Sequence, residues 1–508
     1  MDENVLISHC GPRAHERVLT RRGKCWQRRV QPVEFLRGHS GEPKVMDRRD
    51  FLKIAPASAF ISTLGDTASS AATPPSTKDV PYVAPGSISG PLARGLMPPA
   101  GEPPLPQSRA FKGLRFTGRE RTYVDTIKAD TWYPSWGADG RLYSSYADGS
   151  VKDNAGHDVR VNSQWEQPEG LRERWFRELG WGVEGGQLTR SNDRFTTTGA
   201  AVLTGNDPFA LSATPLAPFR RETPRYEGYY PCANLFHNGV WYYGGYYCHR
   251  WLDNHNVPVT YENGGFGGFR ISTDRGATWR DTPHDDRRPL FPEVGRCSGG
   301  AAIKLGTPHF VDFGRDMEHS PDGYAYLVGH GSYNPDGVSN WCSGDAVSMA
   351  RVRPSPGTMN DPAAWEYFAG RDTGGKDIWS RDFTKIRPLI QWLGGAGCVN
   401  VTYHPGLKRY FGFLCGGPAD GDAGTYNIWV VESERLTGPW SSVACLRGSG
   451  GGQPYFVTMP SKFNQTSRKL VLFYSANWRK DRPGIPTNID SAGPGGLYSL
   501  CVAEFELT

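Results

Sequence analysis

The chain has 508 residues, including 63 glycines, 40 prolines and 12% aromatic residues. This composition is typical of many short strands joined by turns; it excludes a helical bundle, and no run of 18 or more apolar residues predicts a membrane span. Residues 1–45 contain nine Lys/Arg against five Asp/Glu and residues 46–72 three of each, so the body beyond residue 72 carries about +1 of the net +5 and is not expected to bind nucleic acid.

An export signal is predicted near the start of the chain. Residues 47–53 read D-R-R-D-F-L-K, and the pair Arg48 and Arg49 followed by an apolar stretch at 54–64 is typical of a twin-arginine signal. Small residues at 70–72 provide a peptidase site. We therefore expect an upstream extension at 1–45, a signal peptide at 46–72, the twin-arginine export machinery as a partner, and a periplasmic or secreted location.

Residues 73–108 are rich in Pro, Ser and Gly and are expected to form a linker without a fold. From residue 109 to 508 a pattern of two strands around a tight turn recurs five times. Asx-Gly pairs supply the positive φ that tight hairpins need. The five predicted hairpins span residues 132–146, 231–247, 308–328, 399–414 and 455–474.

Further strands are predicted after several of these hairpins, at 268–272, 346–352, 426–432 and 497–505. Regular units of about four strands in this number predict an all-β fold, a five-bladed β-propeller preceded by a disordered leader and linker. The alternative is a pair of β-sandwich domains, which would also give short alternating strands.

Two local motifs carry a resemblance to known families. Residues 272–279, S-T-D-R-G-A-T-W, resemble the Asp-box of sialidase-like propeller blades, in which Asp274 would cap backbone N–H groups and Trp279 would pack between strands. Residues 433–440, S-E-R-L-T-G-P-W, resemble an outer hairpin of five-bladed arabinanases and arabinofuranosidases. The segment from Asp130 to Gly149 is similar to the opening of endo-D-arabinanase-type propellers. These resemblances imply a propeller and glycoside hydrolysis.

Two pairs of cysteines flank predicted hairpin turns, Cys232 with Cys248 and Cys398 with Cys415. Each pair would lie nearly opposite on adjacent strands. Cross-strand disulfides and opposed buried thiols are both open for these pairs, because Cys is also a common small core residue.

Propeller geometry selects the candidate catalytic residues. Ligands bind where the innermost strands begin, and the Asx-Gly turns face the other way, which sets Asp139, Asn238 and Asp322 aside. Glycoside hydrolysis needs two carboxylates at the scissile bond. The acidic residues at the predicted mouth are Asp130 and Asp148 as base or nucleophile, and Glu262 and Glu227 as general acid.

Aromatic, histidine and charged residues near the same face are predicted to bind substrate: Trp132, Trp136, His249, Arg250, Asp253, His309, His330 and Trp478. The tryptophans would form the floor of a sugar subsite. Three histidines with a carboxylate can bind a metal, but no spacing demands one, so neither a metal nor a cofactor is expected.

The sequence therefore favours an exported, monomeric glycoside hydrolase acting on a polysaccharide or glycoconjugate. A carbohydrate-binding propeller without activity would need the aromatics but not the acids. A sialidase would need an arginine triad, and the F-R-I at 269–271 lies beside the Asp-box instead of near the domain start. A polysaccharide lyase using Tyr, His and Arg also remains open.

Overall fold

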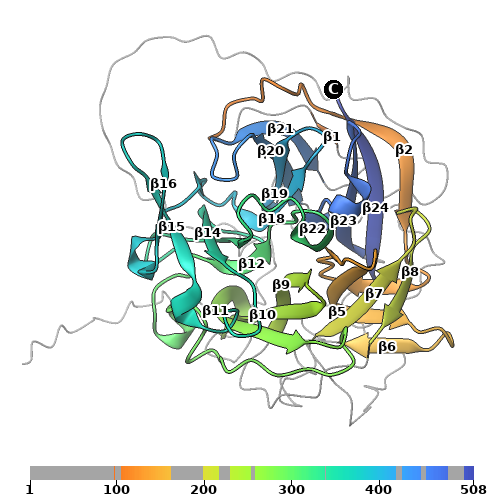
Figure 1. The fold of residues 1–508 in the computed structure, drawn as a ribbon, viewed down its shortest axis with the longest axis horizontal. Helices are drawn as coiled ribbons and strands as arrows, with labels where there is room; N and C mark the ends of the chain where they lie inside the picture. The colour runs from red at the N-terminus through yellow and green to blue at the C-terminus, as the bar shows by residue number, and fades with distance from the viewer. Residues whose placement is uncertain are drawn as a thin grey trace, which may run out of the picture. The chain divides into compact units, whose positions relative to one another are not determined.

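The computed structural model describes residues 96–97, 104–161, 198–216, 229–252, 258–337, 339–418, 426–447, 454–478 and 497–508. The chain divides into two units, Met1–Pro75 and Ser76–Thr508, and all described residues belong to the second. This unit is all-β and forms a five-bladed β-propeller, which confirms the predicted fold class (Figure 1). The predicted extension and export signal lie outside the described residues.

Each blade is a mainly antiparallel sheet that runs outward from the centre. The first has the order β3-β5-β7-β8, with β4 and β6 also paired to β5; its strands are β3 (Ile127–Asp130), β4 (Ser135–Trp136), β5 (Leu142–Lys152), β6 (Asp158–Val161), β7 (Gly199–Thr204) and β8 (Ser212–Pro215). The second blade contains β9 (Tyr229–His237), β10 (Val240–Leu252) and β11 (Pro258–Ser272).

The third and fourth blades carry extra strands at their outer edges. The third contains β12 (Gly306–Phe310), β13 (Ala325–Gly331), β14 (Ala346–Val352), β15 (Glu366–Arg371) and β16 (Asp377–Ser380), with β17 (Ile390–Gln391) paired to β14. The fourth contains β18 (Gly397–His404), β19 (Arg409–Pro418), β20 (Tyr426–Ser433), β21 (Ser441–Arg447) and β1 (Leu96–Met97). Strand β14 has the predicted bounds.

The fifth blade closes the ring with strands from both ends of the described chain. It contains β22 (Pro454–Thr458), β23 (Lys469–Trp478), β24 (Leu497–Leu507) and, at its outer edge, β2 (Leu114–Thr122). Leu114 pairs with Leu507, and Thr122 pairs with Cys501. Figure 1 shows β2 beside β24, with β9, β12, β18 and β22 nearest the centre.

Part of the predicted linker is structured, which differs from the expectation for residues 73–108. Strand β1 pairs with β21 of the fourth blade, and Gln107 forms a parallel bridge with Ser442. The Ser108 hydroxyl donates a hydrogen bond of 2.7 Å to the buried carboxylate of Glu432. These contacts were missed because the Pro-rich composition hides the partner strand, which lies far along the chain.

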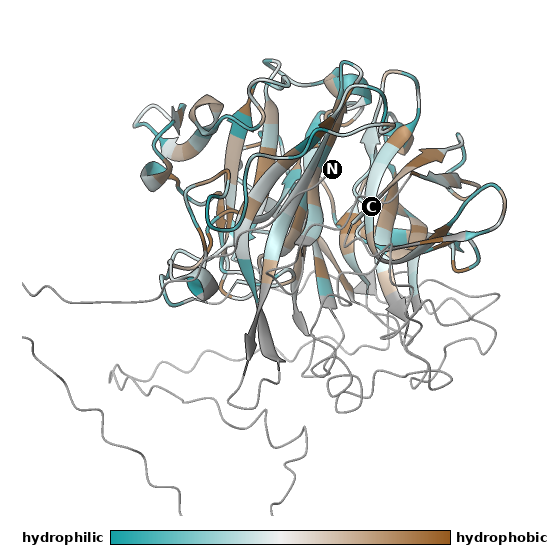
Figure 2. Ribbon diagram, turned by 90° about the horizontal axis from the view of Figure 1, so that it is seen from below, coloured by the Kyte–Doolittle hydropathy of each residue, from teal (hydrophilic) through white to brown (hydrophobic). Residues whose placement is uncertain are grey.

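The strands are rich in β-branched and aromatic residues, which favour extended backbone. Figure 2 shows hydrophobic and hydrophilic positions along the blades. The hairpin turns are those predicted: Asn238 and Gly239 between β9 and β10 both have positive φ, as does Gly140 in the first blade. Short 3₁₀ turns occupy connections between strands, at Arg296–Ser298, Arg315–Met317, Pro362–Ala364, Phe383–Lys385 and Ser461–Phe463.

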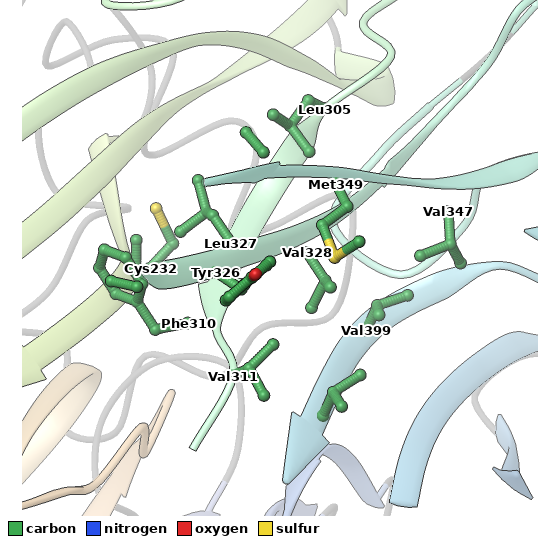
Figure 3. Close-up of a cluster of buried hydrophobic side chains, with 14 of the residues drawn as sticks. Cys232, Leu305, Phe310, Val311, Tyr326, Leu327, Val328, Val347, Met349 and Val399 are labelled. Carbon is green, nitrogen blue, oxygen red and sulfur yellow. The ribbon is translucent and has the colours of Figure 1, made fainter. Parts of the chain in front are cut away.

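The hydrophobic core lies between adjacent blades. Leu327 and Val328 of β13 and Met349 of β14 are fully buried and pack with Val399 of β18, in the next blade (Figure 3). Trp365, at the end of a 3₁₀ turn, is also fully buried and stacks on Phe269 across blades. In the described part of the chain, no helix has the length and apolar character to cross a bilayer.

The turn at residues 272–279 has the hydrogen bonds expected from its sequence. Asp274 accepts a backbone N–H from Thr278 at 2.9 Å and its hydroxyl at 2.6 Å, and these bonds together with Ser272 lower the pKa of Asp274 to about 2. Trp279 packs against Trp241 and Tyr243 of β10. The turn therefore holds an outer part of the second blade.

The cysteines for which cross-strand disulfides and opposed thiols were both open are buried in the structure. Cys232, Cys398 and Cys415 form no disulfide. Cys232 lies opposite Gly244, and Gly397 instead of Cys398 lies opposite Cys415. Of the two alternatives left open by the sequence, the structure contains the buried thiols.

Candidate functional site at the propeller mouth

The inner strands of all five blades share one backbone irregularity. A residue other than glycine adopts positive φ in each, namely Thr131, Ala233, Thr307, Cys398 and Phe456. In the last four the strand pairing shifts register at the same point. Bulges of this kind change the direction of side chains and occur often beside active sites. We call this end of the inner strands the mouth, because it is opposite the hairpin turns.

Below the bulges the strands surround a small cavity on the axis. Every blade contributes at least one polar residue to its lining, which includes Tyr133, Asn234, His309, Asp312, Asn400, Thr402 and Thr458. The cavity has a volume of about 30 Å³, which is enough to hold water. The axis is therefore nearly filled, and a sugar chain does not fit within it.

The sequence predicted that His309 binds substrate at the mouth. The structure instead places His309 in the wall of the axial cavity. Its ring is buried, with the centroid 4.0 Å from that of Tyr133, and neither ring nitrogen has a hydrogen-bond partner within the described residues. Burial, together with neighbouring His330, lowers the pKa of His309 well below its usual value. The imidazole is therefore neutral and lines the axial cavity.

Asp130 ends strand β3 at the mouth, directly before the bulge. Its carboxylate is 5% exposed and accepts a hydrogen bond of 2.6 Å from the Tyr455 hydroxyl of the fifth blade. The Thr131 hydroxyl lies 3.3 Å from the other oxygen, while the Thr131 N–H donates to the hydroxyl of Ser475. The bulge and the fifth blade thus fix the orientation of this carboxylate.

The second candidate in the first blade, Asp148, lies within strand β5 and not in a turn. Its neighbour Ala147 pairs with Asp130. The backbone positions of both aspartates are therefore adjacent at the mouth, while the Asp148 side chain lies outside the described part of the structure.

Glu262 provides a second buried carboxylate. It lies on β11 opposite His249 and is 2% exposed. The Nε of Arg296 is 3.6 Å from Glu262 Oε1. A buried carboxylate is costly unless a cation or hydrogen bonds compensate it, and the Arg296 guanidinium supplies that compensation. The sequence analysis missed Arg296, which lies 34 positions later in a loop.

The predicted sugar-binding tryptophans of the first blade differ from the expectation. Trp132 is 1% exposed, stacks on Tyr146 and donates its indole N–H to the carbonyl of Ala129. Trp136 belongs to β4, which leads to the Asp139 turn and away from the mouth, and packs against the same core. The positive φ of Thr131 breaks the strand alternation, so that Trp132 packs in the core between blades.

His330 ends strand β13 and is completely buried. Its Nε2 donates to the carbonyl of Asn340 at 2.7 Å, and burial lowers the pKa of His330 to about 4 despite that bond. His330 therefore holds the connection between β13 and β14. The sequence had predicted that it binds substrate.

That connection places Trp341 against two aromatic residues of the fifth blade, Tyr455 and Phe456. Trp341 is partly buried, and its ring centroid lies 5.3 Å from that of Tyr455, the partner of Asp130. The ring of Phe456 lies 5.6 Å from Trp341. Trp341 belongs to the third blade and Tyr455 to the fifth, so this contact crosses the mouth. No local sequence pattern indicates it.

The remaining predicted residues lie outside the described part of the structure. This applies to all of Glu227 and Asp253, and to the side chains of His249, Arg250 and Trp478. Among the described residues, no group of three or more His, Cys, Asp or Glu is arranged to hold a metal ion.

No protein-family profile matches the sequence, and no curated protein matches it. Solved structures with a similar fold include a xylan β-1,4-xylosidase from Bacillus halodurans, with 8% identity, 76% of this chain and 56% of that one covered, and a TM-score of 0.40. A family 117 glycoside hydrolase from Zobellia galactanivorans has 12% identity, 78% and 90% coverage, and a TM-score of 0.36.

An N-acetylgalactosamine deacetylase from F. plautii is similar to the same degree, with 13% identity, 77% and 95% coverage, and a TM-score of 0.38. These three proteins catalyse different reactions. Likenesses at such scores assign neither a family nor an activity, and a function for this chain has to be argued from its own site.

Proposed function

We propose that the propeller is a glycoside hydrolase that cleaves a polysaccharide or glycoconjugate with two carboxylates at the mouth. The observation that carries the proposal is the buried Asp130 carboxylate, which is held by the Tyr455 hydroxyl at the start of an inner strand. A carboxylate in a fixed orientation with a tyrosine donor suits a general base or nucleophile.

The second carboxylate of the proposed pair is Glu262, with Glu227 as the alternative general acid. Glu262 is buried, and the guanidinium of Arg296 lies beside it. Two carboxylates placed on different blades can stand on opposite sides of a glycosidic bond, as hydrolysis requires. Asp148, adjacent to Asp130 along the pairing of β3 and β5, is proposed as a further acidic group in the same place.

We further propose that the protein is exported through the twin-arginine machinery as a monomer and acts in the periplasm or outside the cell. This part rests on the sequence around Arg48 and Arg49. Fractionation of cells producing the chain, compared with an Arg48→Lys/Arg49→Lys variant, tests it. Retention of the variant in the cytoplasm is expected, whereas equal export of both proteins would contradict the assignment.

The activity is tested by a screen of diverse glycans with the full chain, measuring new reducing ends. The matched variants are Asp130→Asn at the mouth and Asp139→Asn at the opposite end. Hydrolysis that is lost only in Asp130→Asn supports the proposal. Glycan binding without turnover would indicate a carbohydrate-binding propeller, and unsaturated products absorbing in the ultraviolet would indicate a lyase.

A further inference from the structure

Residues 339–342, in the connection between β13 and β14, contact three other blades at the mouth. The carbonyl of Ser339 accepts the N–H of Asn263 in the second blade at 2.7 Å. The Cys398 thiol of the fourth blade donates to the carbonyl of Trp341 at 3.1 Å. The Trp341 ring packs on Tyr455 of the fifth blade. This short segment therefore joins elements that the strand pairing keeps apart.

One end of the segment contacts Tyr455, the residue that donates a hydrogen bond to Asp130. The Tyr455 ring is 4% exposed and is in contact with Trp341 and with Phe456, whose centroid lies 5.0 Å away. The hydroxyl of this ring donates to Asp130. Since a phenol has only two side-chain torsions, packing on its ring fixes the position of its hydroxyl.

The other end contacts Asn263, the chain neighbour of Glu262. Asn263 is buried and donates its side-chain amide to Ser339 Oγ at 2.9 Å and to the carbonyl of Asn340 at 3.2 Å. Arg296, beside Glu262, donates to the carbonyls of Asp336 and Gly337 in the same connection. Both the backbone of Glu262 and its cation partner are thus anchored to the connection that carries Trp341.

The segment is itself held in one shape. His330 donates to the Asn340 carbonyl, and the side chain of Asn340 accepts the N–H of Cys342 at 3.0 Å. These part-buried hydrogen bonds are expected to make the segment rigid.

We propose that residues 339–342 form a brace that fixes the separation of the Asp130 and Glu262 carboxylates, with Trp341, Tyr455 and Asn263 as positioning residues. The proposal rests on the proposed glycoside hydrolysis. Separation of the two carboxyl groups decides whether a nucleophile or a water attacks the sugar, and a misplacement of about 1 Å can cost about 10²-fold in rate.

The first test does not depend on catalysis. Hydrogen exchange of the Asn263 backbone amide, which is bonded to Ser339, is measured by mass spectrometry or NMR in the full chain. In Trp341→Ala this amide is expected to exchange at least about tenfold faster, because the brace is released at its far end. Trp341→Phe, which keeps a ring on Tyr455, should resemble the wild type. Trp379→Ala, on the outer strand β16, is the matched control and should leave this amide unchanged.

The second test uses a glycan that the wild type cleaves. Trp341→Ala is expected to lower kcat by about 10- to 100-fold while KM changes less than about threefold, because positioning acts in the transition state. Tyr455→Phe should move the acid limb of the kcat/KM profile to higher pH, since Asp130 loses a donor to its charged form. Trp341→Phe should restore most of kcat.

The two tests separate the brace from the activity. Faster exchange at Asn263 in Trp341→Ala supports the brace even where no glycan is cleaved, and in that case only the proposed function fails. Unchanged exchange overturns the brace whatever the activity. A Trp341→Ala variant with an increased KM and an unaltered kcat would also overturn it, because Trp341 would then bind sugar directly without positioning the carboxylates.

Discussion

Both ends of the inner strands contain an aspartate that accepts a tyrosine hydroxyl. At the mouth, the pair is Asp130 with Tyr455, which are 325 positions apart in the chain. At the turn end, Asp139 pairs with Tyr143 and Asp322 with Tyr326, each four positions apart and each at 2.8 Å. The same chemical contact is local at one end and links two blades at the other.

The aspartates at the two ends also differ in their exposure to solvent. The turn aspartates have side chains 24% and 36% exposed, lie near arginines and also accept a backbone N–H of their own turn. Asp130 is 5% exposed. A turn aspartate is explained by the hairpin that it stabilises. Asp130 is buried at the mouth and is fixed by a residue of another blade, and this difference from the turn aspartates is the reason that we propose the chemistry at the mouth.

The largest expected effect is a loss of hydrolytic activity that occurs on substitution at the mouth and not at the turn end. Asp130→Asn should lower glycan hydrolysis by about 10²- to 10⁴-fold, the usual contribution of a positioned acid or base. Asp139→Asn should keep wild-type activity, because its carboxylate only closes a turn. Steady-state rates on the same glycan provide the measurement. Equal losses in both variants would remove the distinction between the two ends.

A turn-end aspartate with long-range partners should affect stability and not activity. Asp312, after β12, accepts the N–H and hydroxyl of Ser461 from the fifth blade, both at 2.7 Å, and the N–H of Gly314. Asp312→Ala leaves these partly buried donors unsatisfied and should cost about 2–4 kcal/mol of unfolding free energy. Chemical denaturation measures it, with Asp312→Asn as the milder control. An unaltered midpoint in Asp312→Ala would contradict the expectation.

The mouth end should also give the protein a pH dependence. Burial raises the pKa of Glu293 to about 7, partly offset by hydrogen bonds from the N–H groups of Lys304 and Leu305, which precede β12. Because the folded pKa lies above the unfolded value of 4.5, this group stabilises the fold below about pH 4.5 and loses that contribution as the pH rises through 7.

Thermal unfolding between pH 4.5 and 8 tests this prediction. The free energy of unfolding of the wild type should fall by about 1–3 kcal/mol relative to that of Glu293→Gln across that interval. At the turn end the opposite holds for Asp274, whose pKa of about 2 keeps it ionised throughout. Parallel curves for the wild type and Glu293→Gln would show that the carboxyl is ionised at all these pH values.

The smallest effect is expected for the local pairs. Tyr143→Phe removes the hydroxyl bonded to Asp139, and it should cost about 0.5–1.5 kcal/mol with no change in activity. Denaturant midpoints for this variant and for Tyr455→Phe, measured side by side with their rates, sharpen the comparison. A loss of activity in Tyr143→Phe would mean that the turn end also takes part in the chemistry.

The sequence predicts the repeated part of the fold well because its signals are local. The hairpin around Asn238 and Gly239 and the strand β14 (Ala346–Val352) follow from alternation and turn residues a few positions apart. Strand β2 was missed because its partner, β24, lies almost the whole propeller away in sequence. Nothing in the residues 114–122 identifies that partner.

The site was predicted less well for two physical reasons. Trp132 was expected at the mouth because it follows Asp130 in an aromatic-rich strand, but after the positive φ of Thr131 its side chain is buried in the core. The partners that hold the carboxylates, Tyr455 and Arg296, come from other blades or loops, where no motif marks them. Asp130 could be chosen as a candidate from its position in the sequence. Its hydrogen-bond partners could be identified only from the fold.

The pairing of β2 with β24 has a consequence for how the chain is made. Strand β24 is the last described strand of the propeller along the chain, so β2 waits for nearly 400 positions without its neighbour during synthesis. Until then the ring is open and the edge of β23 is exposed to other chains. Pairing of β2 with β24 can therefore close the ring only after almost the whole propeller has been synthesised.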